Sequence, residues 1–336
     1  MATADAAQHR IGFLLIPEFP IYAVIPATEA LRIANQNSGR TLFDWRFVSV
    51  DGKPVRAGNG MRVTPDAALD QRPDFTTLIV CAGNQPTQYL DRRLLNWLRR
   101  LDRYGIRLGA LDTGTFALAA AGLMAGYRMT LHWEAIPLFH EHYPELEVVE
   151  QIFVIDRKRI TCAGGAAAID MMLHLIALDQ GTMLAQIVAN GMVHERIRHG
   201  TDPQRAVLDS PMGSLDPLVL RAIRLMEENL EAPLEPQEIA DSVGLTGRRL
   251  ERLFRRKLNE SPARYYLKIR LQAARNLLFY SDVPIQNVAL SCGFSGAEVF
   301  SRTFRGHFGQ SPREFRSNFS TDRLHRFHPE FVQRLG

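Results

Sequence analysis

The first half of the chain alternates between short apolar runs and amphipathic stretches. Apolar runs of a few residues are typical of buried strands, whereas apolar positions that recur at helical spacing indicate helices. Strands are therefore predicted over 11–16, 43–50, 77–83 and 106–111, a hairpin over 152–155 and 159–162, and helices over 27–35, 94–104, 116–125, 166–178 and 183–198. Strands that alternate with helices predict an α/β domain with a mostly parallel sheet and helices on both faces.

The loops that follow the predicted strands are the expected place for a ligand. In open α/β sheets, ligands bind beyond the carboxyl ends of the strands. Residues 17–22, 83–85 and 112–115 follow three of these ends. We therefore expect these three loops to form a pocket.

The second half of the chain contains one helical unit twice, first from Ile239 and again from Val288. The offset between the copies is 49 residues before the turn and 50 after it, so one residue is inserted in the second turn. In each copy a short helix is expected to end at a glycine, and a hydroxyl residue is expected to cap the next helix. The glycines are Gly244 and Gly293, and the capping residues are Thr246 and Ser295. This pattern predicts two helix-turn-helix units.

The second helix of each unit is expected to have an apolar face and an arginine-rich face. The apolar positions are Leu250, Leu253, Phe254, Val299, Phe300 and Phe304. Between Thr246 and Arg275 there are ten Lys or Arg residues and only two acids. A basic second helix after a tight turn is the form that enters a DNA major groove, although a helical bundle with a solvated basic face would carry the same charges. The duplication, the glycine turns and the arginine positions favour DNA binding.

Composition narrows the class of protein further. At 336 residues the chain is long enough for two domains, and a net charge of +4 means that the basic character is local. Three widely spaced cysteines indicate free thiols, and His140 with His142 lacks an obvious third ligand, so neither a metal nor a cofactor is expected. The apolar run 11–16 is too short for a signal sequence or a membrane span, so a cytoplasmic protein is expected.

The duplicated region resembles the DNA-binding domain of the AraC/XylS family. The resemblance covers about a hundred residues and depends mainly on a C-terminal signature. The signature consists of Gly293-Phe294, Phe300-Ser301-Arg302, Phe304-Arg305, Phe308-Gly309, Ser311-Pro312 and Phe315-Arg316. It implies an all-α domain in which a long helix, here 262–280, joins the two helix-turn-helix units.

The first half resembles the DJ-1/PfpI domain (class I glutamine amidotransferase-like) that precedes an AraC-type domain in GlxA-type regulators. The matching segments are 25–35, 112–123, 130–133 and 162–166, together with Asp170. Within that group the chain is most similar to regulators of carnitine, glycine betaine and related catabolism. The resemblance implies a ligand-responsive transcriptional regulator that activates a catabolic operon.

The catalytic residues of the DJ-1/PfpI enzymes are only partly matched. Those enzymes place a cysteine at a sharp strand-to-helix turn, where this chain has Asp112. The acid that assists the cysteine corresponds to Tyr22, and only the histidine has a counterpart, His132. Because a carboxylate is a poor replacement for a thiolate nucleophile, we expect no catalytic residues and a pocket that binds without turnover.

The expected pocket combines a carboxylate with aromatic side chains. Its candidate ligand-binding residues are Phe19, Tyr22, Asn84, Asp112, Thr113, His132 and Trp133. Aromatic faces attract quaternary ammonium groups by cation–π interactions worth about 0.5–2 kcal/mol each, and the resemblance indicates the same ligand class. An amino-acid-like or polyamine-like cation is the second candidate. In the simpler alternatives, Asp112 only caps the following helix and the aromatic residues belong to the core.

The resemblance places base contacts at the exposed starts of the two second helices. The base-contact candidates are Arg248, Glu251, Arg252, Ala297, Glu298, Ser301 and Arg302, the phosphate-contact candidates are Arg255, Arg305 and Lys268, and Arg249 completes the DNA-binding set. Arginine can bond guanine bidentately and glutamate can accept from cytosine, whereas phosphate contacts position without specifying sequence. Two adjacent units are expected to enter successive major grooves, about 34 Å apart.

These expectations describe a regulator with four segments. They are a sensing and dimerisation domain (1–198), a linker (199–214), a DNA-binding domain (215–320) and a C-terminal tail (321–336). The expected partners are double-stranded DNA, a small-molecule inducer, RNA polymerase and a second copy of the chain, with no membrane. Two alternatives stay open: an amidotransferase- or hydratase-like enzyme of the DJ-1/PfpI fold, and an architectural DNA binder with a vestigial N-terminal domain.

Overall fold

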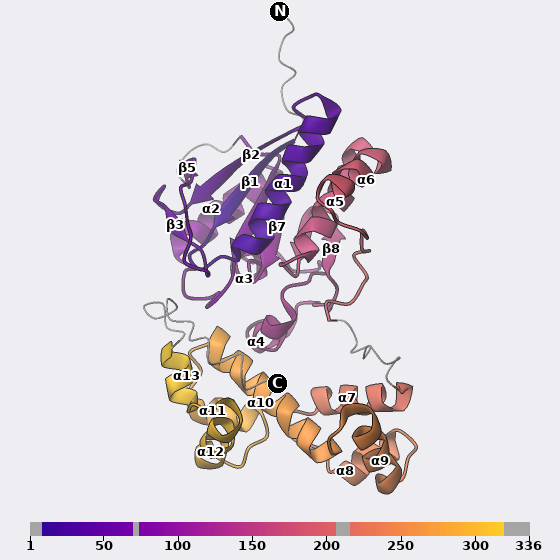
Figure 1. Ribbon diagram of the computed structural model, residues 1–336. Helices are drawn as coiled ribbons and strands as arrows, with labels where there is room; N and C mark the ends of the chain where they lie inside the picture. Colours follow the sequence, from indigo (N-terminus) through magenta and orange to yellow (C-terminus); the bar gives the residue numbers. More distant parts are fainter. Residues whose placement is uncertain (1–8, 70–73, 206–215, 319–336) are drawn as a thin grey trace, which may run out of the picture. The chain divides into compact units, whose positions relative to one another are not determined.

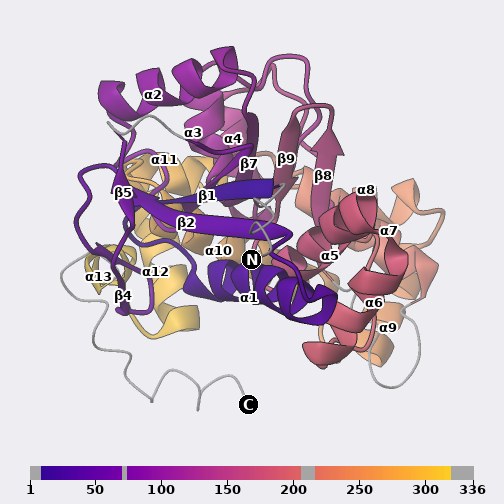
Figure 2. The ribbon, with the colours of Figure 1, turned by 90° about the horizontal axis from the view of Figure 1, so that it is seen from above.

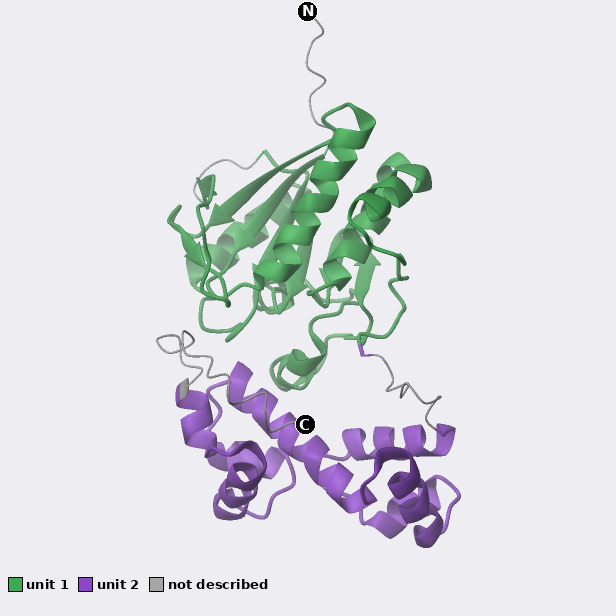
Figure 3. Cartoon of the chain, viewed as in Figure 1, with its two compact units in different colours: residues 1–204 green, residues 205–336 purple. Residues whose placement is uncertain are grey.

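The computed structural model describes residues 9–69, 74–205 and 216–318. The chain divides into two compact units, residues 1–204 and 205–336 (Figure 3). Residues 199–204, which the sequence assigned to the linker, lie in the first unit. The rest of the predicted linker and the tail 321–336 lie outside the described residues.

A seven-stranded sheet in the order β5-β2-β1-β6-β7-β9-β8 forms the centre of the first unit (Figure 1). The strands are β1 (His9–Leu15), β2 (Phe43–Ser49), β5 (Ala67–Ala68), β6 (Thr77–Ala82), β7 (Arg107–Asp112), β8 (Phe153–Asp156) and β9 (Arg159–Cys162). All neighbours pair in parallel except β8 and β9, which form the predicted hairpin. A separate antiparallel ribbon joins β3 (Val55–Arg56) to β4 (Arg62–Val63). The prediction of a mostly parallel sheet is confirmed.

Helices cover both faces of this sheet (Figure 2). The helices α1 (Ile21–Ser38), α5 (Ala167–Gln180) and α6 (Thr182–Gly191) lie on one face, and α2 (Arg92–Arg103) and α3 (Thr115–Ala120) lie on the other. A short 3-10 helix, η1 (Trp133–Ala135), leads into α4 (Ile136–His142). The main core lies between the sheet and the first group, where Phe13, Leu31 and Met172 are fully buried. Each such side chain stabilises the fold by about 1.5–3 kcal/mol relative to an exposed position.

Three predicted helices differ from the structure by several residues at an end. Helix α1 begins at Ile21 and includes Pro26, a residue that normally interrupts a helical pattern. Helix α3 ends at Ala120, well before residue 125, because the backbone turns there and Gly122 N donates to Ala119 O at 2.8 Å. The helix predicted over 183–198 was wrong at its C-terminal end, because α6 stops at Gly191.

The second unit is entirely helical in its described part. Its helices are α7 (Pro217–Glu228), α8 (Pro236–Ser242), α9 (Gly247–Leu258), α10 (Pro262–Tyr280), α11 (Ile285–Ser291), α12 (Ala297–Phe308) and α13 (Pro312–Asn318). The long helix α10 runs from one group of helices to the other (Figure 1) and has the bounds predicted. Its Tyr266 packs in an apolar cluster with Phe254, whereas its Leu271 packs in a second cluster with Phe300 and Phe304. Each helix-turn-helix unit therefore has its own core.

The two turns of this unit are capped differently. Thr246 caps α9 as predicted, because its hydroxyl accepts a hydrogen bond from Arg249 N. The corresponding prediction for Ser295 was wrong: the residue inserted in the second copy makes Gly296 the N-cap of α12, without a side-chain cap. Val299 was also wrongly assigned to the apolar face, because it is 39% exposed.

Candidate functional site

The carboxyl ends of β1, β6 and β7 meet at one edge of the sheet. Leu15 of β1 pairs with Cys81 of β6, and Ala82 of β6 pairs with Asp112 of β7. The three loops expected to form a pocket therefore start side by side. They are also tied together, since the Thr113 hydroxyl donates to Gly83 O at 2.6 Å.

Asp112 occupies the sharp turn between β7 and α3. Its φ of 59° is a left-handed conformation that a non-glycine residue adopts rarely and at a cost of about 1–3 kcal/mol. The loop after β9 approaches it closely: a Cβ atom added to Gly164 would lie 2.9 Å from Asp112 Cβ. Strain of this kind persists where the surrounding structure imposes it, and it is a feature of functional sites.

The Asp112 carboxylate lies in an unusual electrostatic environment. Burial raises its pKa to about 6, while the nearby His132 and a hydrogen bond from the Thr113 backbone act in the opposite direction, and Glu134 contributes a further increase. His132 Nδ1 lies 3.9 Å from a carboxylate oxygen of Glu134. Asp112, His132 and Glu134 thus form a group with more acidic than basic members, which suits a cationic ligand.

The raised pKa of Asp112 predicts that Asp112→Asn stabilises the protein at neutral pH. A carboxyl whose pKa is raised by folding is destabilising once ionised, so the penalty grows as pH rises from 4 to 6 and is complete above 6. The gain is expected to reach at most about 3 kcal/mol at pH 7.5 and to shrink as pH approaches 4. Urea unfolding at several pH values would measure it. A gain that does not change with pH would contradict the prediction.

The segment that carries His132 and Trp133 borders this group. The two rings are tilted by 32° with centroids 6.0 Å apart, and both side chains are half-buried. The backbone N–H of Trp133 donates to the side-chain oxygen of Gln204 at 2.8 Å. An aromatic face and a carboxylate are therefore present in the same region of the first unit.

The remaining predicted pocket residues divide into two groups. Phe19 is fully buried in the core, so it offers no surface to a ligand and we leave it out of the proposed pocket. Thr113 is also fully buried, and its hydroxyl is already used to hold the Gly83 loop. Tyr22 is 62% exposed on α1, and Asn84 is half-buried after β6.

Sequence reasoning missed two residues in this region, Glu18 and Gln204. Glu18 follows β1 directly, is 5% exposed and has a φ of 65°. Its backbone carbonyl packs so closely that a Cβ on Gly83 would lie 2.4 Å from it. Only its position directly after a strand could have indicated Glu18. The acid that assists the cysteine in the DJ-1/PfpI enzymes was aligned with Tyr22 instead. Nothing in the sequence around Gln204 could have indicated its role, since its side chain bonds to residues more than fifty positions away.

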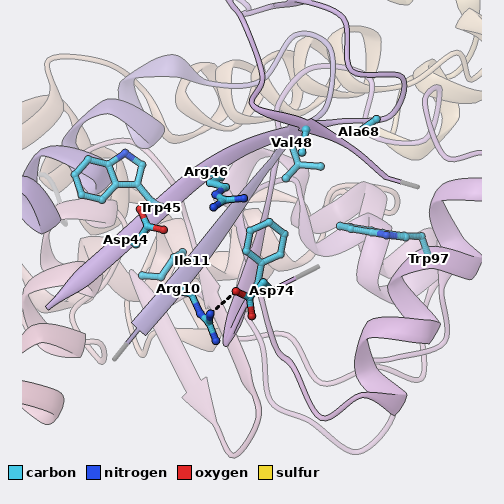
Figure 4. A pocket seen from close by; sticks show the side chains of 11 residues that line it. Arg10, Ile11, Asp44, Trp45, Arg46, Val48, Ala68, Asp74 and Trp97 are labelled. Carbon is cyan, nitrogen blue, oxygen red and sulfur yellow. Dashed lines mark hydrogen bonds and ion pairs between the residues drawn. The ribbon is translucent and has the colours of Figure 1, made fainter. Parts of the chain in front are cut away.

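A pocket elsewhere in the first unit contains none of the predicted ligand-binding residues (Figure 4). Side chains of β1, β2 and α2 line it, including Arg10, Arg46 and Trp97. Arg10 forms an ion pair with Asp74 across it. The candidate site at Asp112 is therefore defined by the strand ends and their side chains.

The candidate DNA-contacting residues lie on α9 and α12. Arg248, Arg249, Arg252, Arg255, Glu298, Arg302 and Arg305 are exposed, whereas Glu251, Ala297 and Ser301 are half-buried. Arg255 Nε donates to Glu251 at 2.8 Å, and Arg305 lies 3.5 Å from Glu314. Lys268 of α10 pairs with Glu260 at 2.8 Å. Arg252 and Arg302 occupy corresponding positions on the second helix of each unit.

The architecture is that of a DNA-binding regulator. Two helix-turn-helix units with basic second helices share one chain with an α/β unit that has a carboxylate at its strand ends. Residues 9–178 match the family model described as DJ-1/PfpI family, and residues 239–318 match the helix-turn-helix domain model. The chain belongs to the AraC/XylS family of transcriptional regulators, in the group with an N-terminal DJ-1/PfpI domain.

Similar proteins carry the same combination of domains. The chain is 44% identical to the HTH-type transcriptional regulator CdhR of Pseudomonas aeruginosa, over 91% of this chain and 90% of that protein. It is 42% identical to the HTH-type transcriptional regulator GbdR of the same species, over 91% and 83% of the two chains. A crystal structure of an AraC family regulator from Pseudomonas putida is similar over 55% of this chain and 99% of that chain, with a TM-score of 0.51 and 26% identity.

These relatives help to decide between a regulator and the alternative of an enzyme of the DJ-1/PfpI fold. They are named transcriptional regulators, and they cover nearly the whole chain, including the DJ-1/PfpI part. The expectation of a regulator and not an enzyme is therefore supported. No helix in the described part of the chain is long and apolar enough to cross a membrane.

Proposed function

We propose that the first unit binds a small cationic metabolite and that this binding controls transcription through the second unit. The observation that carries the proposal is the half-buried Asp112 carboxylate in a strained turn, near His132, whose ring centroid lies 6.0 Å from that of the half-buried Trp133. A carboxylate beside an aromatic face suits a quaternary ammonium group. Carnitine, glycine betaine and amino-acid-like cations are the ligand classes to test first, given the regulators that the sequence resembles.

The wider function follows from the same proposal. The protein acts in the cytoplasm as a homodimer, binds double-stranded DNA through the two helix-turn-helix units, and activates a catabolic operon by contact with RNA polymerase. The exposed arginines of α9 and α12 support the DNA-binding part. The sensing, linking and DNA-binding segments are those assigned from the sequence, with residues 199–204 added to the sensing segment.

A thermal-shift screen of the full chain tests the ligand. The panel is carnitine, glycine betaine, choline, dimethylglycine and arginine at pH 7.5. A ligand that binds only the folded state raises its stability by about 2.7 kcal/mol at a hundredfold excess over Kd. We expect one compound to give a saturable shift that is lost in Asp112→Ala and in Trp133→Ala, and that weakens below pH 6 as Asp112 becomes protonated.

The control for this screen is Asp44→Ala, which removes a half-buried carboxylate of β2. It should leave the shift unchanged. The full chain is used because a fragment that ends at residue 199 would lack Gln204, which bonds to the Trp133 backbone. No response to any compound, or a response that survives both Asp112→Ala and Trp133→Ala, would contradict the proposed site.

Arg252→Ala tests how the second unit recognises DNA. If Arg252 contacts a base, its removal weakens binding by about 1–3 kcal/mol and relaxes the preference at one base pair. Arg255→Ala is the matched comparison, because removal of a side chain that binds phosphate weakens binding to all sequences and lowers the salt dependence. Binding to DNA selected in vitro, with each base pair varied, measures both effects. An unchanged base preference in Arg252→Ala would contradict the assignment.

A further inference from the structure

The residues after α6 run back across the first unit. We call residues 192–204 the strap. Asp170 of α5, which is fully buried, anchors its first part. The Asp170 carboxylate accepts hydrogen bonds from His194 Nε2 at 2.9 Å and from the Arg198 backbone N–H at 2.8 Å, and both Nε and Nη2 of Arg198 donate to its second oxygen. A buried charge with this many donors holds the strap firmly.

The second part of the strap lies along the residues that precede β8. Ile152 N donates to Asp202 O at 3.1 Å, and Gln151 forms an antiparallel bridge with Pro203. Gly200 fits tightly against Phe153, since a Cβ on Gly200 would lie 2.9 Å from the Phe153 carbonyl oxygen. The strap therefore reaches its last residue while still bound to the first unit.

Gln204, the last residue of the strap, bonds to the segment that carries His132 and Trp133. Its amide nitrogen donates to Thr130 Oγ1 at 3.0 Å, to Leu131 O at 2.8 Å and to Gln151 O at 3.0 Å. Its side-chain oxygen accepts from the Trp133 backbone N–H at 2.8 Å. One amide nitrogen has only two hydrogens for three acceptors, so these bonds are shared.

We propose that Gln204 is a positioning residue that couples the ligand site to the connection with the DNA-binding unit. This inference rests on the proposed function of the Asp112 region. A ligand that contacts His132 or Trp133 acts on the segment 130–133, whose backbone is bonded directly to Gln204. The chain continues from Gln204 into the second unit, so movement of this segment changes how firmly the strap is held.

Release of the strap has a physical consequence for the second unit. With the strap bound, the connection between the units can begin only after Gln204. If the end of the strap is released, its residues become part of the connection. The effective concentration of one unit near the other then falls, because the connection is longer. Gln204 thereby sets the length of the connection according to the state of the ligand site.

Hydrogen exchange of the full chain, measured by mass spectrometry, tests the coupling. Gln204→Glu has the same shape and keeps the acceptor for Trp133 N–H, but it presents an oxygen to the three acceptors that the amide served. We expect exchange at the amides of residues 130–133 and 198–204 to accelerate about tenfold or more, because buried acceptors are left without their donor. Gln186→Glu is the matched control, since Gln186 is exposed on α6 and bonds only to Asn190 in the described structure. It should leave these amides unchanged.

The same exchange experiment is repeated with a ligand. The ligand is whichever compound of the thermal-shift panel raises the melting temperature of the natural protein. We expect that compound to alter exchange of the strap in the natural protein. In Gln204→Glu it should still shift the melting temperature, but it should no longer alter strap exchange. If Gln204→Glu does not fold, Gln204→Asn, which draws the amide back by one methylene, carries the same expectations.

Two outcomes would overturn the coupling: unchanged strap exchange in the Gln204 variants, or a strap response to the compound that persists in them. If no compound shifts the natural protein, the proposed ligand class fails. In that case the arm without ligand still decides whether Gln204 links the segment 130–133 to the strap.

Discussion

Gly293→Ala is expected to destabilise the DNA-binding unit by about 3 kcal/mol and to abolish specific DNA binding. Gly293 has a φ of 71°, so any side chain there costs about 1–2 kcal/mol. In addition, its new Cβ would lie 2.3 Å from Pro233 Cγ and 2.6 Å from Leu230 O. Such overlap forces the turn at Gly293 away from the segment between α7 and α8 and costs a further 1–3 kcal/mol or so. Urea unfolding and binding to selected DNA measure the two effects.

Gly244→Ala provides the matched control. Gly244 occupies the same place in the first turn and has a φ of 72°, but a Cβ there meets no atom within 4 Å. We expect it to cost only the conformational term, about 1–2 kcal/mol. Equal losses of stability for the two substitutions would show that the packing of Gly293 against residues 230–233 does not matter.

Asp170→Asn is expected to destabilise the first unit by about 3 kcal/mol. The carboxylate is completely buried and accepts hydrogen bonds from His194 and from both the backbone and the side chain of Arg198. An asparagine presents an NH₂ group to at least one of these donors and leaves the Arg198 charge without its partner. Because Arg198 is 31% exposed it can turn to water, which places the loss of stability at the lower end for a buried ion pair.

Asp179→Asn tests whether this loss of stability comes from burial. Asp179 lies near the end of α5, is 23% exposed and is 3.5 Å from His9 Nδ1. A partly exposed pair of this kind contributes about 0.2–1 kcal/mol. Chemical unfolding of the two variants, followed by a probe in the first unit, should separate them by about 2 kcal/mol or more. A comparable destabilisation in both would contradict the role of the Asp170 network.

The second unit was the easier half to predict. Helical periodicity, the glycine turns and the duplicated pattern are local properties of the chain, and the long helix α10 has the predicted bounds. The prediction that Ser295 caps α12 was wrong because the inserted residue moves the start of the helix, so that Gly296 is its N-cap. The prediction that Val299 lies on the apolar face was wrong because the sequence of a helix does not show which of its apolar positions are covered by neighbouring helices.

The candidate ligand site was predicted only in part. The sharp turn at Asp112 and its place beside the other strand ends follow from the alternation of strands and helices, since parallel strands bring their carboxyl ends together. Phe19 and Tyr22 stand three residues apart in one loop and helix start, yet one is fully buried and the other is 62% exposed. Their difference depends on packing with α1 and on the short bridge between Phe19 and Ala57.

The sequence by itself determined the fold class of both units, the family and the positions of the basic residues on the second helices. All of these depend on periodicity and on short motifs, which act on the conformation of neighbouring residues in the chain. Only the tertiary structure decided the environment of Asp112, the close fit of Gly293 against Pro233, and the course of the strap to Gln204. These features arise between residues far apart in the chain, where burial and hydrogen-bond geometry depend on every packed neighbour and no local pattern records them.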